Sequence, residues 1–217
     1  MRPEDIDKAI SRIKLAVKPW QTPAVTVVAR EKDPYKVLIS CILSLRTQDK
    51  TTADASARLF ELAGTPTEML GLDAAAIEKA IYPVGFYRNK ARSILDISRM
   101  IMDDFGGTVP DDIDKLLKLP GVGRKTANLV VTIGHGKPGI CVDTHVHRIM
   151  NRWGYIAAKT PEKTETALRE KLPRKHWIPI NDLLVTFGQN LCKPVSPLCS
   201  TCPVYEFCDR VGVGKHR

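Results

Sequence analysis

Long hydrophobic runs are absent from this sequence of 217 residues. The N-terminal segment from Met1 to Asp7 is charged and lacks the apolar core of a secretion signal, and no apolar run is long enough to span a bilayer. These absences exclude a membrane-spanning helix and predict a soluble protein that is not exported. We therefore expect a reducing compartment, in which disulfide bonds are disfavoured.

Internal repeats, low-complexity tracts and convincing strand patterns are also absent. A short β-like run from Val25 to Val28 has no obvious partner strand, so we expect an extended connector over Trp20 to Val28. Apolar residues recur instead at helical spacing along most of the chain. The sequence therefore predicts an all-α fold.

Each predicted helix has an apolar face, and several begin at a capping residue or a proline. The helix that opens at Asp33-Pro34 is apolar nearly all round, which predicts a central core helix. The other expected ranges are 4–17, 53–63, 73–81, 89–105, 110–119, a helix carrying the apolar face Ala127 to Ile133, a helix from Thr160-Pro161 to Pro173, and 181–191.

Positive charge exceeds negative charge in this chain. Lys and Arg number 33 and Asp and Glu number 24, which gives a net charge of +9 and a pI of about 9.3. This excess favours a polyanionic partner that is bound by release of counterions. Because many soluble proteins are basic, charge alone does not identify the partner.

A glycine-containing stretch, LPGVGRKTA from Leu119 to Ala127, separates two apolar helical faces. Gly121 and Gly123 permit backbone angles that are closed to other residues, so successive amide N–H groups can point outward together. This pattern predicts a helix, a short hairpin and a second helix. Such a hairpin suits a phosphate.

Lys125 lies in the first turn of that second helix. The helix dipole and the neighbouring Arg124 both disfavour an ammonium there, so we expect the pKa of Lys125 to be lowered and its amine to be nucleophilic. Further on, Asp143 is a lone carboxylate that could accept the lysine proton or oppose a developing cation. The alternative is an ordinary surface lysine and an aspartate that only caps the helix from His145.

Six cysteines are unevenly distributed. Cys41 and Cys141 lie in apolar surroundings and read as small buried hydrophobes. The other four are separated by six, two and five residues, which predicts metal ligation, and they are Cys192, Cys199, Cys202 and Cys208. Spacing alone favours zinc and an iron–sulfur cluster about equally.

The order LPGVGRKTAN from Leu119 to Asn128, followed by VDTHVHR from Val142 to Arg148, closely resembles the helix-hairpin-helix DNA glycosylases of the endonuclease III family. The resemblance implies that Lys125 attacks the sugar C1′ of a flipped nucleotide and that Asp143 assists. Related adenine and mismatch glycosylases usually have another residue type in place of the lysine, so Lys125 implies an enzyme that also cuts the strand. The hairpin residues that the resemblance assigns to the DNA backbone are Gly121, Val122, Gly123 and Arg124.

Two further stretches resemble the same family, the polar corner from Ser44 to Lys50 and the loop from Pro83 to Lys90. In the family, a polar residue at the position of Arg46 enters the space left by the flipped base, although that residue is often Gln. The loop wedges an apolar side chain, here Phe86, into DNA. Asp49 in the corner is also expected at the DNA. The alternative for the polar corner is a solvated turn. The alternative for the loop is a Phe86 side chain that is buried.

The resemblance extends to the cofactor and the architecture. The cysteine spacing is that of the endonuclease III family and implies a 4Fe–4S cluster. Two helical lobes are also implied: a six-helix barrel over residues 27–137 that holds the hairpin, and an iron–sulfur cluster domain made of residues 1–26 and 138–217.

The function implied by the resemblance is a bifunctional DNA glycosylase and AP lyase. It removes oxidised pyrimidines in base excision repair and cleaves the strand by β-elimination. We expect a monomer, without a membrane partner, that binds double-stranded DNA containing damaged bases or abasic sites. Its expected location is the cytoplasm, at the nucleoid in a bacterium or archaeon. Two alternatives stay open: a mismatch thymine or uracil glycosylase of the same fold, and a noncatalytic, redox-sensing DNA-binding protein.

Overall fold

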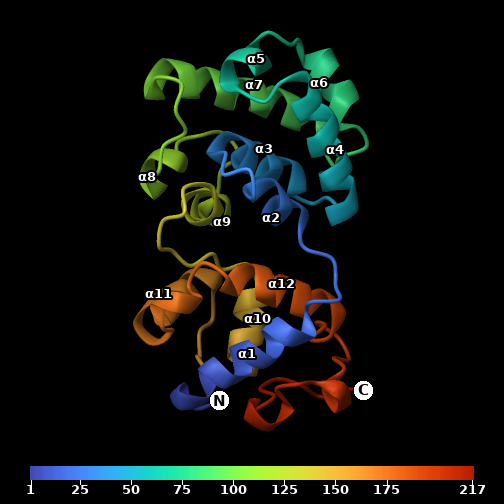
Figure 1. Ribbon diagram of the computed structural model, residues 1–217, viewed down its shortest axis with the longest axis vertical. Coiled ribbons are helices and arrows are strands. Elements are labelled where there is room, and N and C mark those ends of the chain that lie inside the picture. Colours follow the sequence, from blue (N-terminus) through green and yellow to red (C-terminus); the bar gives the residue numbers. More distant parts are fainter. The chain divides into compact units, whose positions relative to one another are not determined.

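The computed structural model describes residues 1–217 and contains helices and no strands, which confirms the predicted all-α fold (Figure 1). No helix has both the length and the apolar character of a membrane span. The α-helices are α1 (Ile6–Ala16), α2 (Ala24–Ala29), α3 (Pro34–Ser44), α4 (Asp49–Leu62), α5 (Pro66–Leu70), α6 (Ala74–Ile81), α7 (Tyr87–Phe105), α8 (Ile113–Leu116), α9 (Arg124–Leu129), α10 (Thr144–Arg152), α11 (Pro161–Lys171) and α12 (Ile180–Asn190).

The chain divides into two compact units. The central unit is continuous and runs from Ala24 to Lys137. The terminal unit combines Met1–Pro23 with Pro138–Arg217, so the two ends of the chain belong to the same unit. The predicted division lay after residues 26 and 137, and the assignment of a six-helix barrel and a cluster domain to these parts stays a prediction.

Helix α3 is the core of the central unit. Asp33 caps it by accepting hydrogen bonds from the backbone N–H groups of Tyr35 and Lys36, and Pro34 occupies its first turn. It packs against α2, α4, α7, α9 and the π-helical turn η2 (Val130–Gly134). Its fully buried apolar side chains are Val37, Leu38, Ile39, Cys41, Ile42 and Leu43. The predicted central core helix is therefore present.

The prediction of an extended connector over Trp20 to Val28 was wrong, because residues from Ala24 onward form helix α2. The carboxylate of Asp49 accepts the N–H of Ala24 with both oxygens at 3.0 Å, and α2 packs against α3 and α4. β-Branched residues cost a helix only a few tenths of a kcal/mol each, so packing overrides their preference when no partner strand exists.

Helix ends were predicted less well than helix positions. Helix α4 begins at Asp49 rather than Ala53, and its N-cap Gln48 makes no side-chain capping bond that the sequence could have signalled. Helix α5 was missed altogether. Its signal was present, because Thr65 and Glu68 form a reciprocal capping box at its start.

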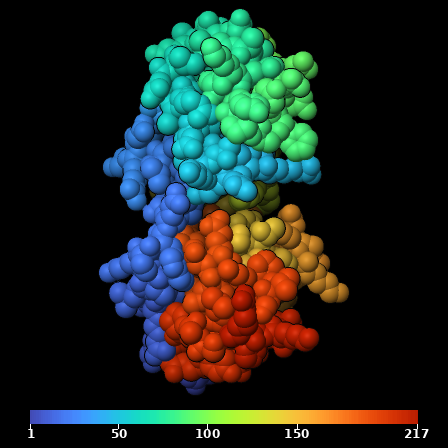
Figure 2. Space-filling model, turned by 90° about the vertical axis from the view of Figure 1, so that its right-hand side faces the viewer, coloured from blue at the N-terminus to red at the C-terminus, as the bar shows by residue number.

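The terminal unit has its own core, in which α12 packs against α1 and α10. Trp153, Tyr155 and Phe187 are its largest fully buried side chains. The N-terminal segment lies beside the C-terminal part of the chain, as Figure 2 shows in blue and red. Asp7 on α1 adds an ion pair to this contact, because its carboxylate meets Lys175 Nζ at 2.5 Å and His176 Nε2 at 2.6 Å.

The central position of α3 predicts that replacing a leucine on α3 lowers the free energy of unfolding much more than replacing an exposed leucine on α4. Leu38→Ala should lower the free energy of unfolding by about 2–5 kcal/mol, because the substitution loses buried surface and leaves a cavity. Leu62→Ala, at a side chain that is 55% exposed, should change it by less than about 0.5 kcal/mol. Urea unfolding followed by circular dichroism measures both. Equal losses would contradict a core built on α3.

Candidate functional site

The glycine hairpin joins α8 to α9 as predicted, and its two glycines serve different needs. Gly121 has φ of +75°, in the left-handed region that favours glycine, and Val122 turns inward and is buried. Gly123 has φ of −95°, which any residue can adopt, and a Cβ there would meet no atom within 4 Å. The prediction of a special backbone angle is therefore confirmed for Gly121 and wrong for Gly123. At Gly123 the lack of a side chain leaves the backbone amides uncovered.

Lys125 lies in the first turn of α9 and is exposed, as is Arg124 beside it. The buried Cys41 thiol of α3 lies within electrostatic range of Lys125. Burial raises the pKa of Cys41 to about 12, and the charge of Lys125 acts in the opposite direction. A neutral thiol therefore lies behind the lysine, and Cys41 is the small buried hydrophobe that was predicted.

Asp143 is the N-cap of α10 in the terminal unit. Its Oδ1 accepts the backbone N–H groups of His145 and Val146, both at 2.9 Å, and its side chain is 8% exposed. The capping role considered as an alternative is therefore present. A carboxylate has two oxygens and about four acceptor positions, so a cap made by one oxygen is compatible with a second role.

The polar corner and the loop before α7 bring Arg46 and Phe86 together. Both residues have left-handed backbones, with φ of 52° and 59°, and the guanidinium carbon of Arg46 lies 5.6 Å from the centroid of the Phe86 ring. Phe86 is 60% exposed, so the alternative of a buried Phe86 was wrong. A cation resting on an exposed aromatic ring is thus presented at the surface of the central unit.

Asp49, also expected at the DNA, has a structural task. It begins α4, and its two carboxylate oxygens hold the first amide of α2. This contact joins two helices of the central unit. The assignment of Asp49 to DNA binding stays a prediction.

The four C-terminal cysteines gather in one part of the terminal unit. Burial is the main cause that raises the pKa of Cys199, Cys202 and Cys208, and the neighbouring sulfurs raise it further, to about 11 for Cys202. The pKa of each of these three responds to Cys192. The four sulfurs are therefore close enough to interact, as the ligands of a multinuclear cluster must be.

Two arginines on α10 hold the first of these cysteines, and sequence reasoning missed both. Arg152 donates to Cys192 Sγ at 3.3 Å and to the carbonyl of Lys193 at 2.9 Å. Arg148, one turn earlier, donates to the carbonyl of Cys192 at 2.9 Å. Donors to a ligand sulfur are typical of cluster sites. Their spacing of four residues on one helix face was the available signal.

The donor set of four cysteine thiolates fits an iron–sulfur cluster. Nowhere in the chain do three His, Cys, Asp or Glu side chains converge on a point that could hold one metal ion. Four irons of a cubane spread their thiolates over a wider space than one zinc does, and the sulfurs of Cys192, Cys199 and Cys208 all act on the pKa of Cys202. The cysteine loop, residues 192–208, is therefore a candidate cluster site.

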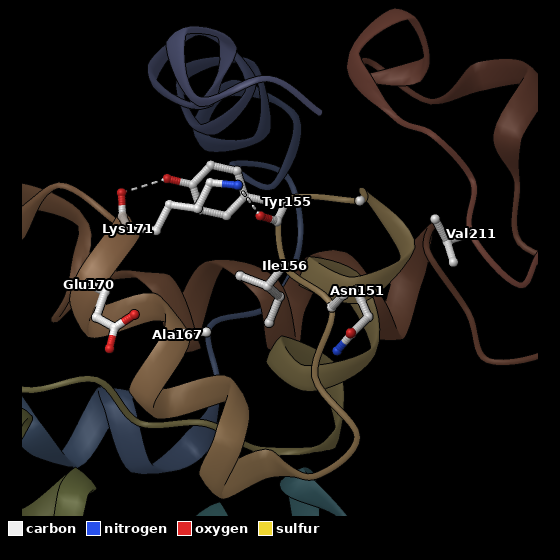
Figure 3. Close-up of a pocket in the computed structure, with 9 residues that line it drawn as sticks. Asn151, Tyr155, Ile156, Ala167, Glu170, Lys171 and Val211 are labelled. Carbon is white, nitrogen blue, oxygen red and sulfur yellow. Dashed lines mark hydrogen bonds between the residues drawn. The ribbon is translucent and has the colours of Figure 1, made fainter.

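A cavity of about 510 Å³ lies elsewhere in the terminal unit (Figure 3). Tyr155 and Lys171 close one side, where the Tyr155 hydroxyl donates to the Lys171 carbonyl and Lys171 Nζ donates back to the Tyr155 carbonyl. Its other walls are mainly apolar. None of the predicted site residues lines it.

Two protein-family models match the chain. The model described as HhH-GPD superfamily base excision DNA repair protein matches residues 39–174, which include the hairpin, Lys125 and Asp143. The model described as the iron-sulfur binding domain of endonuclease III matches residues 192–208, the whole cysteine loop.

Individual proteins are similar over nearly the full chain. Endonuclease III of Thermotoga maritima is 48% identical over 191 residues, which cover 87% of this chain and 90% of that protein. A solved non-covalent endonuclease III–DNA complex is 34% identical with a TM-score of 0.84, covering 97% of this chain and 96% of that one. A trapped endonuclease III–DNA covalent intermediate is 32% identical with a TM-score of 0.81, covering 97% of each.

The cysteine loop predicts a specific loss of iron. Wild-type protein should carry about four irons per chain, as a 4Fe–4S cluster requires. Cys199→Ala should lose most of this iron and yield less folded protein, because cluster binding energy contributes to folding. Cys141→Ala, which removes a buried thiol outside the loop, should keep it. Elemental and sulfide analysis measures both; one zinc without sulfide would contradict the assignment.

Proposed function

The chain belongs to the HhH-GPD superfamily of base excision DNA repair proteins, and from this premise we propose that it is a DNA glycosylase and AP lyase of the endonuclease III type, acting on oxidised pyrimidines. The predicted family resemblance is confirmed by the two family models and the 48% identical relative. The observation that carries the proposal is Lys125, exposed in the first helical turn after the glycine hairpin.

The first step in the proposal is extrusion of the damaged nucleotide, because C1′ is shielded while the base stays stacked. Arg46 and Phe86 support this step, since an exposed aromatic ring and a cation can enter the gap and unstack the neighbouring base. The hairpin residues from Gly121 to Arg124 would hold the backbone phosphates through amide N–H groups and charge.

Lys125 is the proposed nucleophile. As its amine nitrogen bonds to C1′, the bond from C1′ to the base breaks and its electron pair leaves with the base, which takes up a proton. Loss of a proton from nitrogen and opening of the sugar ring give a Schiff base. Removal of a C2′ proton then expels the 3′ phosphate by β-elimination. The strand is cut on the 3′ side of the lesion.

Asp143 is proposed to act by its charge. A carboxylate opposes the positive charge that develops on the sugar and can accept the proton that Lys125 must lose. The cap that Asp143 makes on α10 supports this role, because two backbone amides fix the orientation of its carboxylate.

The cofactor of the cysteine loop is a 4Fe–4S cluster, as predicted. We propose Cys192, Cys199, Cys202 and Cys208 as its ligands. The cluster supplies cross-links that keep the loop folded, and no reaction step is assigned to it. The contacts of Arg148 and Arg152 with Cys192 support this arrangement, because they attach the first proposed ligand to the well-packed helix α10.

The proposed partner is double-stranded DNA with a damaged base or abasic site, bound by a monomer in the cytoplasm, or at the nucleoid of a bacterium or archaeon. The family relationship favours this enzyme over a noncatalytic redox sensor. A mismatch thymine or uracil glycosylase has the same fold, and no observation on this chain favours it.

Borohydride trapping tests the nucleophile. Wild-type protein, incubated with a duplex containing an oxidised pyrimidine, should form a covalent adduct when the Schiff base is reduced. Lys125→Ala should abolish the adduct while duplex binding persists, because the hairpin backbone is unchanged. Lys115→Ala, at an exposed lysine on α8, is the matched control and should trap normally. Normal trapping and nicking by Lys125→Ala would assign the chemistry to another amine.

Asp143→Asn separates chemistry from capping. The amide oxygen should still cap α10, so the melting temperature should stay close to that of the wild type. Loss of the negative charge should slow single-turnover base excision by about a hundred- to a thousandfold. Measuring both quantities on one sample decides between the roles, and a normal rate would remove Asp143 from the mechanism.

A further inference from the structure

A buried lysine lies beneath the surface that presents Arg46 and Phe86. Lys90, on the first turn of α7, is 7% exposed. Its ammonium donates to the carbonyls of Leu43 at 2.8 Å and Leu45 at 2.5 Å and to the hydroxyl of Thr47 at 3.2 Å. These carbonyls stand at the end of α3, where a helix leaves such groups without intrahelical partners. The lysine therefore caps the core helix from outside.

The same contacts reach the loop that carries Phe86. Thr47 Oγ1 also accepts the backbone N–H of Gly85 at 3.2 Å, so one hydroxyl joins Lys90 to the residue before Phe86. The two segments touch directly here, because a Cβ on Gly85 would lie 2.6 Å from the carbonyl oxygen of Arg46. The residues on either side of Arg46 and the residue before Phe86 are thus held by one connected set of bonds.

We propose that Lys90 is a positioning residue that holds Arg46 and Phe86 in a single arrangement ready to enter DNA, an inference that rests on the proposed function. Both side chains stand on left-handed backbones that non-glycine residues adopt only when neighbouring structure imposes them. Lys90 and Thr47 supply that constraint. The guanidinium and the ring then meet the duplex as one unit.

A positioning role explains the contacts of Lys90 more fully than a role in folding alone. Every bonding partner of the Lys90 ammonium is a neutral oxygen, and burial lowers the pKa of Lys90 to about 8, so desolvation of the cation offsets part of what these bonds contribute to folding. A methionine of similar length would fill the same space. Three donors are needed to bond the two carbonyls and the hydroxyl between Leu43 and Thr47, and this hydroxyl passes the constraint on to Gly85.

The test measures DNA distortion without chemistry. The holoenzyme is mixed with a duplex that carries a tetrahydrofuran abasic analogue next to 2-aminopurine, whose fluorescence rises when it unstacks. This analogue offers no base to remove and no aldehyde to trap. Lys90→Met should bind the duplex and retain its iron, yet lower the rate of the fluorescence rise by about tenfold to a hundredfold, as loss of hydrogen bonds from a charged donor implies.

Three further variants make the test specific. Thr47→Val keeps the shape of the side chain and removes the shared hydroxyl, so it should slow the rise in the same direction even if Lys90→Met folds poorly. In an Arg46→Ala, Phe86→Ala background, Lys90→Met should have no additional effect, because the residues it positions are gone. Lys171→Met, at another lysine bonded to a carbonyl, should behave as wild type.

Two results would overturn the proposal. A normal rise in both Lys90→Met and Thr47→Val would show that the bonds do not position the inserting side chains, and an equal further loss in the double-alanine background would show a general structural effect. A wild-type protein that gives no rise would instead contradict the proposed function itself, and this role with it.

Discussion

Burial of α3 on all sides is the constraint on which the central unit depends. Because the helix has no solvent-facing apolar surface to spare, its position fixes the segments that rest on it. Its side chains Cys41 and Ile42 lie behind the hairpin, near Lys125 and Gly121 respectively. Its last carbonyls lead into the polar corner. One rigid element therefore sets both the proposed nucleophile and the proposed inserting residues.

Helix α10 has the corresponding place in the terminal unit. It begins at the cap made by Asp143, and one and two turns later Arg148 and Arg152 hold the backbone and the sulfur of Cys192 respectively. The buried side chains Ile149 and Met150 pack this helix into the core between those ends. Helix α10 thereby holds both the Asp143 carboxylate and the cysteine loop, which are far apart in the sequence.

The sequence was sufficient for features that depend on local chemistry. The cap and proline of α3, the hairpin, the position of Lys125 in its turn and the clustering of four cysteines all follow from neighbouring residues. Features that depend on distant partners were missed. The β-like run that begins at Val25 lies in a helix because α2 packs on α3 and α4 and Asp49 holds its first amide, and the burial of Lys90 follows from a corner more than forty residues earlier.

The two glycines of the hairpin differ in what selects them. Gly121 is required by the chain itself, since its left-handed backbone would strain any larger residue. Gly123 has an ordinary conformation and open space around it, so an added methyl group would meet no clash and would cost only the small preference of the N-cap of α9 for glycine over alanine. In the proposed DNA contact, its small size lets a phosphate approach the hairpin amides closely. A loss of DNA binding on substitution here that exceeds the small loss in helix capping would therefore report the ligand rather than the fold.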